Sequence, residues 1–351
     1  MAGGQRESSY FISSNRSKRS ITVDLACERG QDLIRRLAAR SDILIENFKV
    51  GDLNRKNLSY SELSAINPKL IYCSITGFGA TGPRAEDPGY DYLIQARGGL
   101  MSLSGHPDGA PGAGPMRVGL AISDLTTGMN AAIAILAALH AREQSGSGQF
   151  IDIAMLDVQV SWLANQAQSY FATGVVPQRT GDQHASIVPY QPFRTQDGRI
   201  VIAVGNDTQF QRLCAVIGCS ELAEDQRFLT NAARVENRRS LIDVLASEIA
   251  EWSTASLEAQ LRAAQIPCGP IQSLDEVFSD PQVIARGMVV PMTHPHLGSI
   301  KTLANPVKFS ATPLSYDRPP PVLGEHTDEV LAQVMGLTED EIAGLRSRNV
   351  I

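Results

Sequence analysis

A single carboxylate within residues 119–142 has the setting of a nucleophile. Asp124 stands there beside Ser123, before a run of Ala, Leu and Ile with no acidic residue, Lys or Arg until Arg142. Such a run predicts a helix buried almost all round, with Ser123 and Asp124 at the N-cap position. The carboxylate would then lie beside free backbone N–H groups and the positive end of the helix dipole. Asp124 is therefore either a helix cap or an ionised nucleophile that can accept an acyl group.

Other residues are weaker candidates for chemistry. Asp157 also follows a strand-like segment, at residues 150–155, but its setting is typical of a structural cap or a surface residue. The cysteines form no C-x-x-C pair and have no His at metal-ligand spacing, so we expect free thiols, no metal site and a cytoplasmic protein. These cysteines are Cys27, Cys73, Cys214, Cys219 and Cys268.

Residues 77–82 match the pattern G-x-G-x-x-G, but they do not indicate a dinucleotide site. That motif must open a helix, whereas Pro83 and then Asp87-Pro88-Gly89 follow here, and these are loop formers. We therefore expect a loop near the site and no nicotinamide cofactor. The backbone N–H groups of Gly77 and Gly79 could stabilise an oxyanion, or the two glycines could serve only the turn.

The length and the net charge of the sequence limit the classes of protein to which it can belong. The 351 residues exceed one ordinary domain, and 43% hydrophobic residues support a large core. The net charge of −6 and the absence of a long basic run argue against a nucleic-acid partner. No apolar run looks long enough to cross a bilayer, and the helix after Asp124 is expected to be too short.

Strand and helix patterns alternate along the first third of the chain. Strands are expected at residues 20–25, 42–48 and 69–75, with helices at 29–40 and 59–66 between them. This order predicts parallel strands with right-handed crossovers. Ligands of such sheets bind beyond the C-terminal strand ends, where Asn47, Phe48 and Gly77 stand.

The second half of the chain has the signals of another domain. Glycines and prolines fill residues 173–190, and a strand at 199–204 with helices at 207–217, 238–251 and 255–264 follows. We predict a large α/β domain over residues 1–172, to which residues 291–351 return. A linker at 173–190 and a small α+β domain at 191–290 complete the expected arrangement.

Short motifs in fixed order give the chain a family resemblance. They include Ile45-Glu-Asn-Phe48, Gly77-Phe-Gly-Ala-Thr-Gly-Pro83, Gly89-Tyr-Asp91, Asp124-Leu-Thr-Thr-Gly128, Ile266-Pro-Cys-Gly-Pro270 and Leu323-Gly-Glu-His-Thr327. Together they resemble family III CoA-transferases over essentially the whole sequence. Within that family the likeness is to succinyl-CoA:glutarate and related dicarboxylate enzymes. The residues behind it include Pro88-Gly-Tyr-Asp-Tyr92 and His184-Ala-Ser-Ile-Val-Pro-Tyr190.

The resemblance implies a fold, a reaction and an assembly. The fold would be a Rossmann-like large domain with a smaller α+β domain, in an interlocked homodimer. Family members carry a further strand–helix–strand unit before the segment matched by Tyr10-Phe11, and this sequence begins after it. The family nucleophile, an Asp in Asp-x-x-x-Gly, matches Asp124 with Gly128. CoA would pass from an acyl-CoA such as succinyl-CoA to a dicarboxylic acid through an aspartyl-CoA thioester, with CoA as substrate and no tightly bound cofactor.

The resemblance also assigns binding residues. Gly77 and Gly79 remain the candidate oxyanion donors, and His184 could orient an acyl carboxylate. The lysine that the family carries after the first CoA segment is replaced here by Ala26. The CoA contacts map onto Val23, Asp24, Leu25, Asn47, Phe48, Lys49, Arg55, Gly89, Tyr90 and Asp91.

Two alternative functions stay open at this point. The α-methylacyl-CoA racemases resemble this chain as well, but they use a His where Tyr90 stands, and Tyr is a poor base for moving a proton. An inactive CoA-binding assembly subunit is the other alternative, because the sequence lacks the family's first unit.

Overall fold

The computed structural model describes residues 7–351 and divides the chain into two compact units. The first unit comprises residues 7–98, 120–163 and 278–351, and the second comprises residues 99–119 and 164–277. Residues 1–6 of the expected large domain lie outside the described residues. The domain boundaries expected from the sequence stay a prediction.

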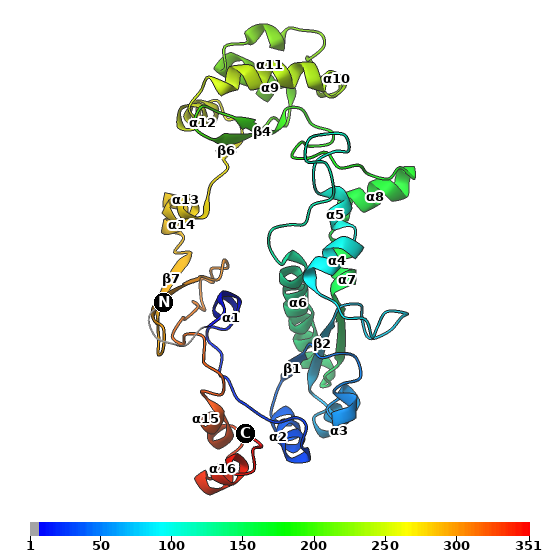
Figure 1. Ribbon diagram of the computed structural model, residues 1–351, viewed down its shortest axis with the longest axis vertical. Helices are drawn as coiled ribbons and strands as arrows, with labels where there is room; N and C mark the ends of the chain where they lie inside the picture. The colour runs from blue at the N-terminus through cyan, green and yellow to red at the C-terminus, as the bar shows by residue number, and fades with distance from the viewer. Residues whose placement is uncertain (1–6) are drawn as a thin grey trace. The chain divides into compact units, whose positions relative to one another are not determined.

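A parallel three-stranded sheet lies at the centre of the first unit (Figure 1). Its strands are β1 (Ile43–Glu46), β2 (Ile71–Thr76) and β3 (Phe150–Ala154), in the order β1-β2-β3. Ile45 is in register with Cys73, and Cys73 with Ile151. Helix α2 (Glu28–Ala38) precedes β1, and α3 (Tyr60–Ile66) connects β1 to β2. The alternating pattern therefore predicted the α/β class correctly.

The two faces of the sheet are covered by different segments, because successive strand residues point to opposite faces. Tyr72 packs with Leu58 and Leu63, in a cluster that joins β2 to α3 and the loop before it. Its neighbour Cys73 packs instead against Ala131 and Ile135. These two residues belong to α6 (Ile122–Ser145), which lies along the opposite face.

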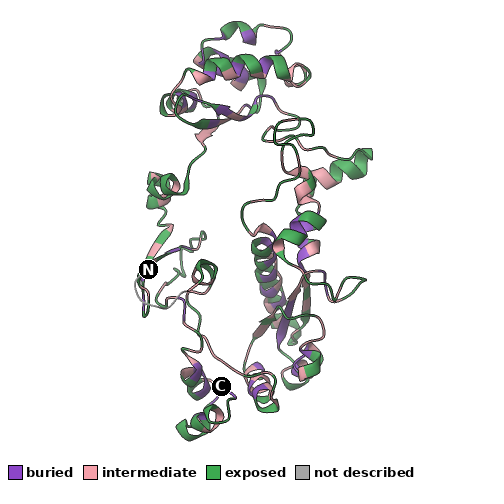
Figure 2. Cartoon of the chain, in the orientation of Figure 1, coloured by how far each residue is buried: buried purple, intermediate pink, exposed green. Residues whose placement is uncertain are grey.

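Helix α6 buries one face and exposes the other, so the prediction of a helix buried all round was wrong. The sheet covers the buried face, while the opposite side has no cover among the described residues (Figure 2). The exposed side chains are 52–66% accessible and recur every three or four residues, and they are Leu125, Met129, Ile133 and Leu136. The buried residues of the helix are Ser123, Thr126, Thr127, Ala131, Ile135 and Ala138.

The length of α6 also corrects an expectation. It runs for 24 residues, because the polar residues around Asp124 are themselves helical. By length and composition it is the one helix in the described part of the chain that could cross a membrane. Core helices of globular proteins meet the same criterion, so this observation alone assigns no membrane.

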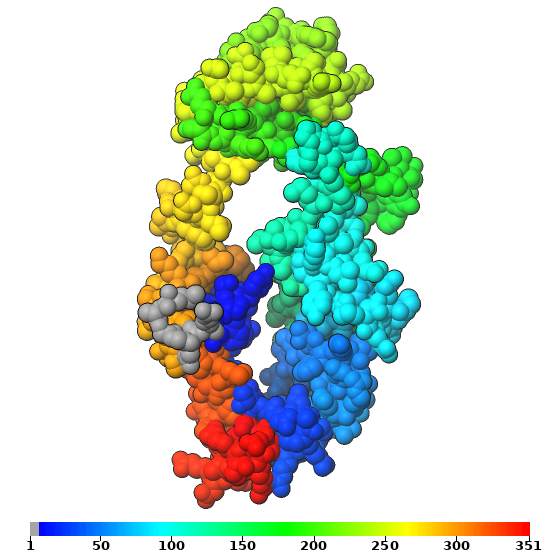
Figure 3. All heavy atoms as spheres, in the orientation of Figure 1, coloured from blue at the N-terminus to red at the C-terminus, as the bar shows by residue number. Residues whose placement is uncertain are grey.

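Residues 20–25 do not form the strand expected from their alternation. Their backbone N–H groups bond to the C-terminal part of the chain rather than to a neighbouring strand. Ser20 N donates to His326 Nδ1 at 3.2 Å, and Asp24 N donates to the Val350 carbonyl at 2.9 Å. Beside this segment, α2 packs on α15 (Thr327–Gln333) and α16 (Glu339–Arg346) (Figure 3).

The remaining elements of the first unit are short. A β7–β8 hairpin lies at the start of the C-terminal segment of this unit. The elements are α1 (Ser9–Ser14), η1 (Asn54–Lys56), α4 (Asp91–Arg97), α7 (Met155–Ser161), α14 (Pro281–Ala285), β7 (Val289–His294) and β8 (Gly298–Leu303). Helix α13 (Leu274–Ser279) spans the boundary between the units.

The second unit is built on an antiparallel sheet of the order β4-β5-β6. Its core includes Ile200 and Ile202 of β5, Phe210 of α9 and Leu241 of α11. The elements are α5 (Leu100–Leu103), α8 (Ala164–Thr173), β4 (Tyr190–Arg194), β5 (Arg199–Ala203), α9 (Asp207–Val216), η2 (Ser220–Ala223), α10 (Asn231–Glu236), α11 (Arg238–Ala250), α12 (Thr254–Ala263) and β6 (Cys268–Pro270).

Candidate active site

Asp124 lies in the first turn of α6 rather than at its cap. The helix begins at Ile122 with Ala121 as N-cap, so Asp124 is the third helical residue. Its side chain makes no hydrogen bond or ion pair within residues 7–351. A carboxylate in the first helical turn is stabilised by the positive end of the helix dipole. Because it caps nothing, the Asp124 carboxylate is available for chemistry.

The capping role belongs to Asp91, the first residue of α4. Asp91 Oδ1 accepts a hydrogen bond from Ser123 N at 2.8 Å, and Oδ2 accepts one from Gln95 Nε2 at 2.7 Å. The Ser123 hydroxyl donates to Gln159 Oε1 at 2.7 Å. Ser123, Gln95 and Gln159 are each buried, so this polar network fixes the start of α6 against α4 and α7. Sequence reasoning placed Ser123 at the helix start but missed Gln95 and Gln159, although Gln95 stands one helical turn after Asp91.

The surroundings of Asp124 raise the pKa of its carboxyl group. Burial by the pocket wall is the larger cause, and the negative charge of Asp91 is the second. The Asp124 residue is nevertheless exposed overall, so water still reaches part of it. A carboxylate with a raised pKa is more basic, and a more basic oxygen is the better nucleophile among similar groups.

Two glycines bring α4 to the end of β2. A Cβ atom on Gly77 would lie 2.5 Å from Gly89 Cα, and a Cβ atom on Gly89 would lie 2.3 Å from Gly77 Cα. Real side chains do not tolerate such distances, so the two backbones can touch only as glycines. This contact carries Tyr90 and Asp91 to the C-terminal edge of the sheet, where the strand order places ligands.

Of the two backbone donors suggested for an oxyanion, those of Gly77 and Gly79, the N–H of Gly79 is used within the loop. Gly79 N donates to Thr76 Oγ1 at 2.9 Å. Ala80 N donates to both carboxylate oxygens of Asp152, at 3.2 and 3.0 Å. In this structure neither N–H is free for a substrate. As expected, the loop opens no helix.

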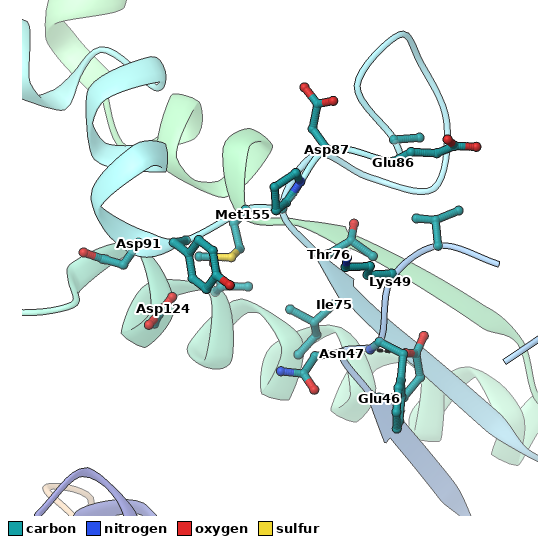
Figure 4. Close-up of a pocket in the computed structure, with 18 of the residues that line it drawn as sticks. Glu46, Asn47, Lys49, Ile75, Thr76, Glu86, Asp87, Asp91, Asp124 and Met155 are labelled. Carbon is teal, nitrogen blue, oxygen red and sulfur yellow. Dashed lines mark hydrogen bonds between the residues drawn. The ribbon is translucent and has the colours of Figure 1, made fainter. Parts of the chain in front are cut away.

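One pocket of about 700 Å³ collects most of the predicted site residues (Figure 4). In the view, Asp91 and Asp124 lie toward one side, and Glu46, Asn47 and Lys49 lie toward the other. Residues that sequence reasoning did not select, such as Thr127, Gly128 and Met155, complete the wall beside Asp124. The predicted residues that line the pocket are Asn47, Phe48, Lys49, Gly77, Gly89, Tyr90, Asp91 and Asp124.

Other predicted residues lie outside this pocket. Leu25 lines a neighbouring cavity of about 280 Å³, which it shares with Phe48. Val23 packs in the cluster formed with the C-terminal helices, and Asp24 accepts a hydrogen bond from Ala26 N. Arg55 forms an ion pair with Asp52. Gly79 is absent from the residues that line the pocket, and so is the rival candidate Asp157, which is exposed in the first turn of α7.

His184 belongs to the second unit. Its ring stacks on Tyr190 with 5.1 Å between the centroids, and its Nδ1 accepts a hydrogen bond from Ser186 N at 3.2 Å. Arg238 donates to the His184 carbonyl at 2.9 Å, and buried Arg234 donates to the Val188 carbonyl at 2.8 Å. The segment that carries His184 is therefore held in place by side chains of α10 and α11.

The pocket is strongly acidic. Its lining includes five carboxylates, and Lys49 is the one cation among the described residues that line it. No group of three His, Cys, Asp or Glu residues suited to a metal occurs within residues 7–351. The carboxylates are Glu46, Glu86, Asp87, Asp91 and Asp124.

Comparison with known proteins identifies the family of this chain. The family model for CoA-transferase family III matches residues 1–327. A succinate–glutarate CoA-transferase of Agrobacterium fabrum is 44% identical over 332 residues, which cover 95% of this chain and 82% of that protein. A succinyl-CoA:glutarate CoA-transferase of Mus musculus is 41% identical and covers 98% of this chain and 78% of its own length.

Solved structures lead to the same family. The crystal structure of a CaiB/BaiF family protein from Brucella suis has a TM-score of 0.84 and 45% identity. The match covers 94% of this chain and 85% of that one. The resemblance inferred from the motifs is thus confirmed, and the chain belongs to CoA-transferase family III.

Proposed function

We propose that this CoA-transferase moves CoA from succinyl-CoA to a dicarboxylic acid such as glutarate, with Asp124 as the nucleophile. The names of its relatives support this donor and acceptor. The observation that carries the assignment to Asp124 is its free carboxylate on the wall of the pocket, in the first turn of α6.

The reaction runs through two anhydrides and one thioester. A carboxylate oxygen of Asp124 attacks the thioester carbonyl of succinyl-CoA, the C–S bond breaks, and CoA thiolate leaves. The thiolate attacks the Asp124 carbonyl of the mixed anhydride and expels succinate, which gives the aspartyl-CoA thioester. The acceptor carboxylate attacks this thioester and releases the thiolate. The thiolate then attacks the acceptor acyl carbonyl, which forms the new acyl-CoA and restores Asp124.

A carboxylate suits this sequence for a physical reason. It is ionised at neutral pH, since the usual pKa of Asp is about 3.9, and its acyl derivatives stay reactive enough to be attacked again. One transfer is thereby divided into several easier steps. Water must be kept out while these derivatives exist, because it would hydrolyse them.

The walls of the pocket offer contacts for CoA. Asn47, Phe48 and Lys49 lie on one side, and Gly89 to Asp91 on the other, so a pantetheine arm would lie between the end of β1 and the start of α4. Leu25 and Phe48 share the neighbouring apolar cavity, which suits the flat adenine ring. CoA enters as substrate, and we propose no tightly bound cofactor.

The test is transfer from succinyl-CoA to isotope-labelled glutarate, followed by chromatography of the acyl-CoA products. We expect labelled glutaryl-CoA from the wild type and a loss of on the order of 10³-fold or more in Asp124→Asn, because the nucleophile is gone. Asp157→Asn is the matched control and should keep wild-type turnover. Borohydride added during turnover should modify residue 124.

Four results would contradict the proposal. Label at another residue, or normal turnover in Asp124→Asn, would exclude Asp124 as nucleophile. Exchange of the α-proton of a 2-methylacyl-CoA without CoA transfer would instead favour a racemase. Binding of CoA without either reaction would favour an assembly subunit.

We also propose that the enzyme works as an interlocked homodimer. The apolar side of α6, made of Leu125, Met129, Ile133 and Leu136, is more exposed than a stable monomer ordinarily leaves such a surface. The acidic pocket supports the same view, because its anionic substrates need more positive charge than Lys49 supplies. A second copy of the chain would cover the apolar side and could supply that charge.

A cytoplasmic location is the accompanying proposal. All five cysteines lie within the described residues and are free thiols. Such thiols persist in a reducing compartment.

A further inference from the structure

Three glycines of the described chain lie inside helices, and only one of them has a packing reason. A Cβ atom on Gly30 of α2 would lie 1.9 Å from the Asp24 carbonyl oxygen, so no side chain fits there. A Cβ atom on Gly128 of α6 or on Gly344 of α16 would meet no atom within 4 Å. Neither Gly128 nor Gly344 has a positive φ.

Gly128 is therefore not explained by the fold of this chain. Glycine in a helix interior weakens the helix, because its backbone loses more freedom on folding than that of alanine. Nothing in the backbone geometry or the packing around residue 128 requires that loss. The reason for a glycine at this place must then lie outside the packing of the single chain.

The position of Gly128 suggests which function it serves. It follows Asp124 by four residues, and residues four apart lie one above the other on the same face of a helix. Both residues line the same pocket, and both are exposed to it. A side chain at residue 128 would thus extend into the space next to the Asp124 carboxylate.

We propose that Gly128 keeps open the approach by which an acyl carbonyl group reaches the carboxylate of Asp124. A methyl group at residue 128 would occupy part of this space, and a larger side chain would shield Asp124. The inference rests on the proposed function, because that function requires an acyl carbonyl group to reach Asp124. It also makes residue 128 a position where the size of the acyl group is selected.

A close contact between two copies of α6 is the competing reason for a glycine. Small residues let helices approach one another closely, and the apolar side of α6 begins in the same turn. The two explanations differ in their result. If Gly128 served a contact between copies, then a side chain there would change the oligomeric state, whereas the access explanation leaves that state unchanged.

The experiment compares Gly128→Ala and Gly128→Leu with the matched pair Gly344→Ala and Gly344→Leu. The controls make the same change inside another helix where the space is also open. We expect Tm to rise in both alanine variants, because alanine is the better helix former. We expect kcat/KM with succinyl-CoA and glutarate to fall by about 100-fold in Gly128→Ala, since small misplacements at a reacting centre have effects of that size. The kcat/KM of Gly344→Ala should equal that of the wild type.

A second readout does not depend on turnover. A water-soluble carbodiimide with glycine ethyl ester modifies accessible carboxyl groups, and peptide mapping measures the rate at residue 124. We expect Gly128→Leu to slow this modification at least about tenfold, with Gly344→Leu unchanged and the mass of the assembly unaltered. If the wild type transfers no CoA, the proposed function fails, and this labelling rate alone decides the access inference.

Three outcomes would overturn the inference. The first is kcat/KM within twofold of the wild type in Gly128→Ala. The second is an equal labelling rate of Asp124 in the wild type and Gly128→Leu. The third is a loss of activity that accompanies a changed oligomeric mass, which would assign Gly128 to a contact between copies.

Discussion

Asp91 Oδ1 accepts the backbone N–H of Ser123 at 2.8 Å, and this hydrogen bond determines what Asp124 is free to do. The first N–H groups of a helix need acceptors, and a side chain at the start of the same helix usually supplies one. Here the acceptor comes from the start of α4 instead. Asp124 is released from capping, while burial and, second, the charge of Asp91 raise its pKa.

Replacing Asp91 by Asn should separate its charge from its hydrogen bonds. The Asn oxygen can still accept from Ser123 N, and the Gln95 amide can turn to face the Asn amide. Because the negative charge of Asp91 contributes to the raised pKa of Asp124, its removal lowers that pKa. We expect the acid limb of the kcat/KM profile to move to lower pH. If Asp91 had only a structural role, Asp91→Asn would lower kcat/KM and leave the acid limb of the profile at the same pH.

Replacing Asp124 by Asn should stabilise the fold at neutral pH while it abolishes turnover. The folded-state pKa of Asp124 is raised, so the folded protein binds this proton more tightly than the unfolded chain does. The free energy of unfolding therefore falls as the pH rises from the pKa of Asp124 in the unfolded chain through its pKa in the folded protein. Asn carries no charge and avoids this loss. We expect a higher Tm for the variant at pH 7 and no difference at a pH below both pKa values, where Asp124 is protonated.

Local signals in the sequence were sufficient for the sheet but not for the hydrogen-bond network. Strands β1 and β2 follow from continuous apolar runs, and the rule that ligands bind at C-terminal strand ends placed Asn47 and Gly77 at the pocket. The hydrogen bond between Asp91 and Ser123 joins residues 32 positions apart. No periodicity in the sequence encodes which distant carboxylate will cap a helix.

The errors have physical reasons of the same kind. The alternation of residues 20–25 is typical of a strand, but their backbone N–H groups found partners near residues 326 and 350. The apolar composition of α6 predicted burial all round, and composition cannot say whether the covering surface belongs to the same chain. The glycines of residues 77–82 left an oxyanion site and an ordinary turn both open, whereas Gly77 serves a close contact with Gly89.

Gly77→Ala should destabilise the first unit. The added methyl carbon would lie 2.5 Å from Gly89 Cα, and backbone atoms cannot move aside as a flexible side chain can. Overpacking of this kind costs about 1–3 kcal/mol, which urea unfolding would measure. Gly119→Ala is the control, because a Cβ atom there meets nothing within 4 Å. Equal unfolding midpoints for the two variants would show that the Gly77–Gly89 contact is not tight in solution.

Arg234→Met should destabilise the second unit severely. The guanidinium is fully buried and bonds to Asp207 at 2.8 Å, to the Val188 carbonyl at 2.8 Å and to the Phe228 carbonyl at 2.9 Å. Methionine fills part of the volume but leaves two buried carbonyls without donors. A buried polar group left without its partner costs about 1–3 kcal/mol, and this variant leaves two of them. Asp207→Asn should cost much less, because Asp207 is half exposed and Asn can still accept the bond. Similar losses of unfolding free energy in Arg234→Met and Asp207→Asn would contradict this ranking.

Charge on the exposed side of α6 should prevent assembly of the proposed homodimer. Ile133 is 66% exposed in the single chain, so Ile133→Asp places a carboxylate in water and leaves the monomer core intact. In a dimer that covers this side, the same carboxylate would be buried without a partner, at a cost of several kcal/mol. Light scattering coupled to gel filtration should report half the wild-type mass, while circular dichroism stays unchanged. Glu143→Gln, near the C-terminal end of the same helix and exposed, is the control and should keep the wild-type mass. If Ile133→Asp stays at that mass, another surface holds the two copies together, and the apolar side of α6 must have a different cover.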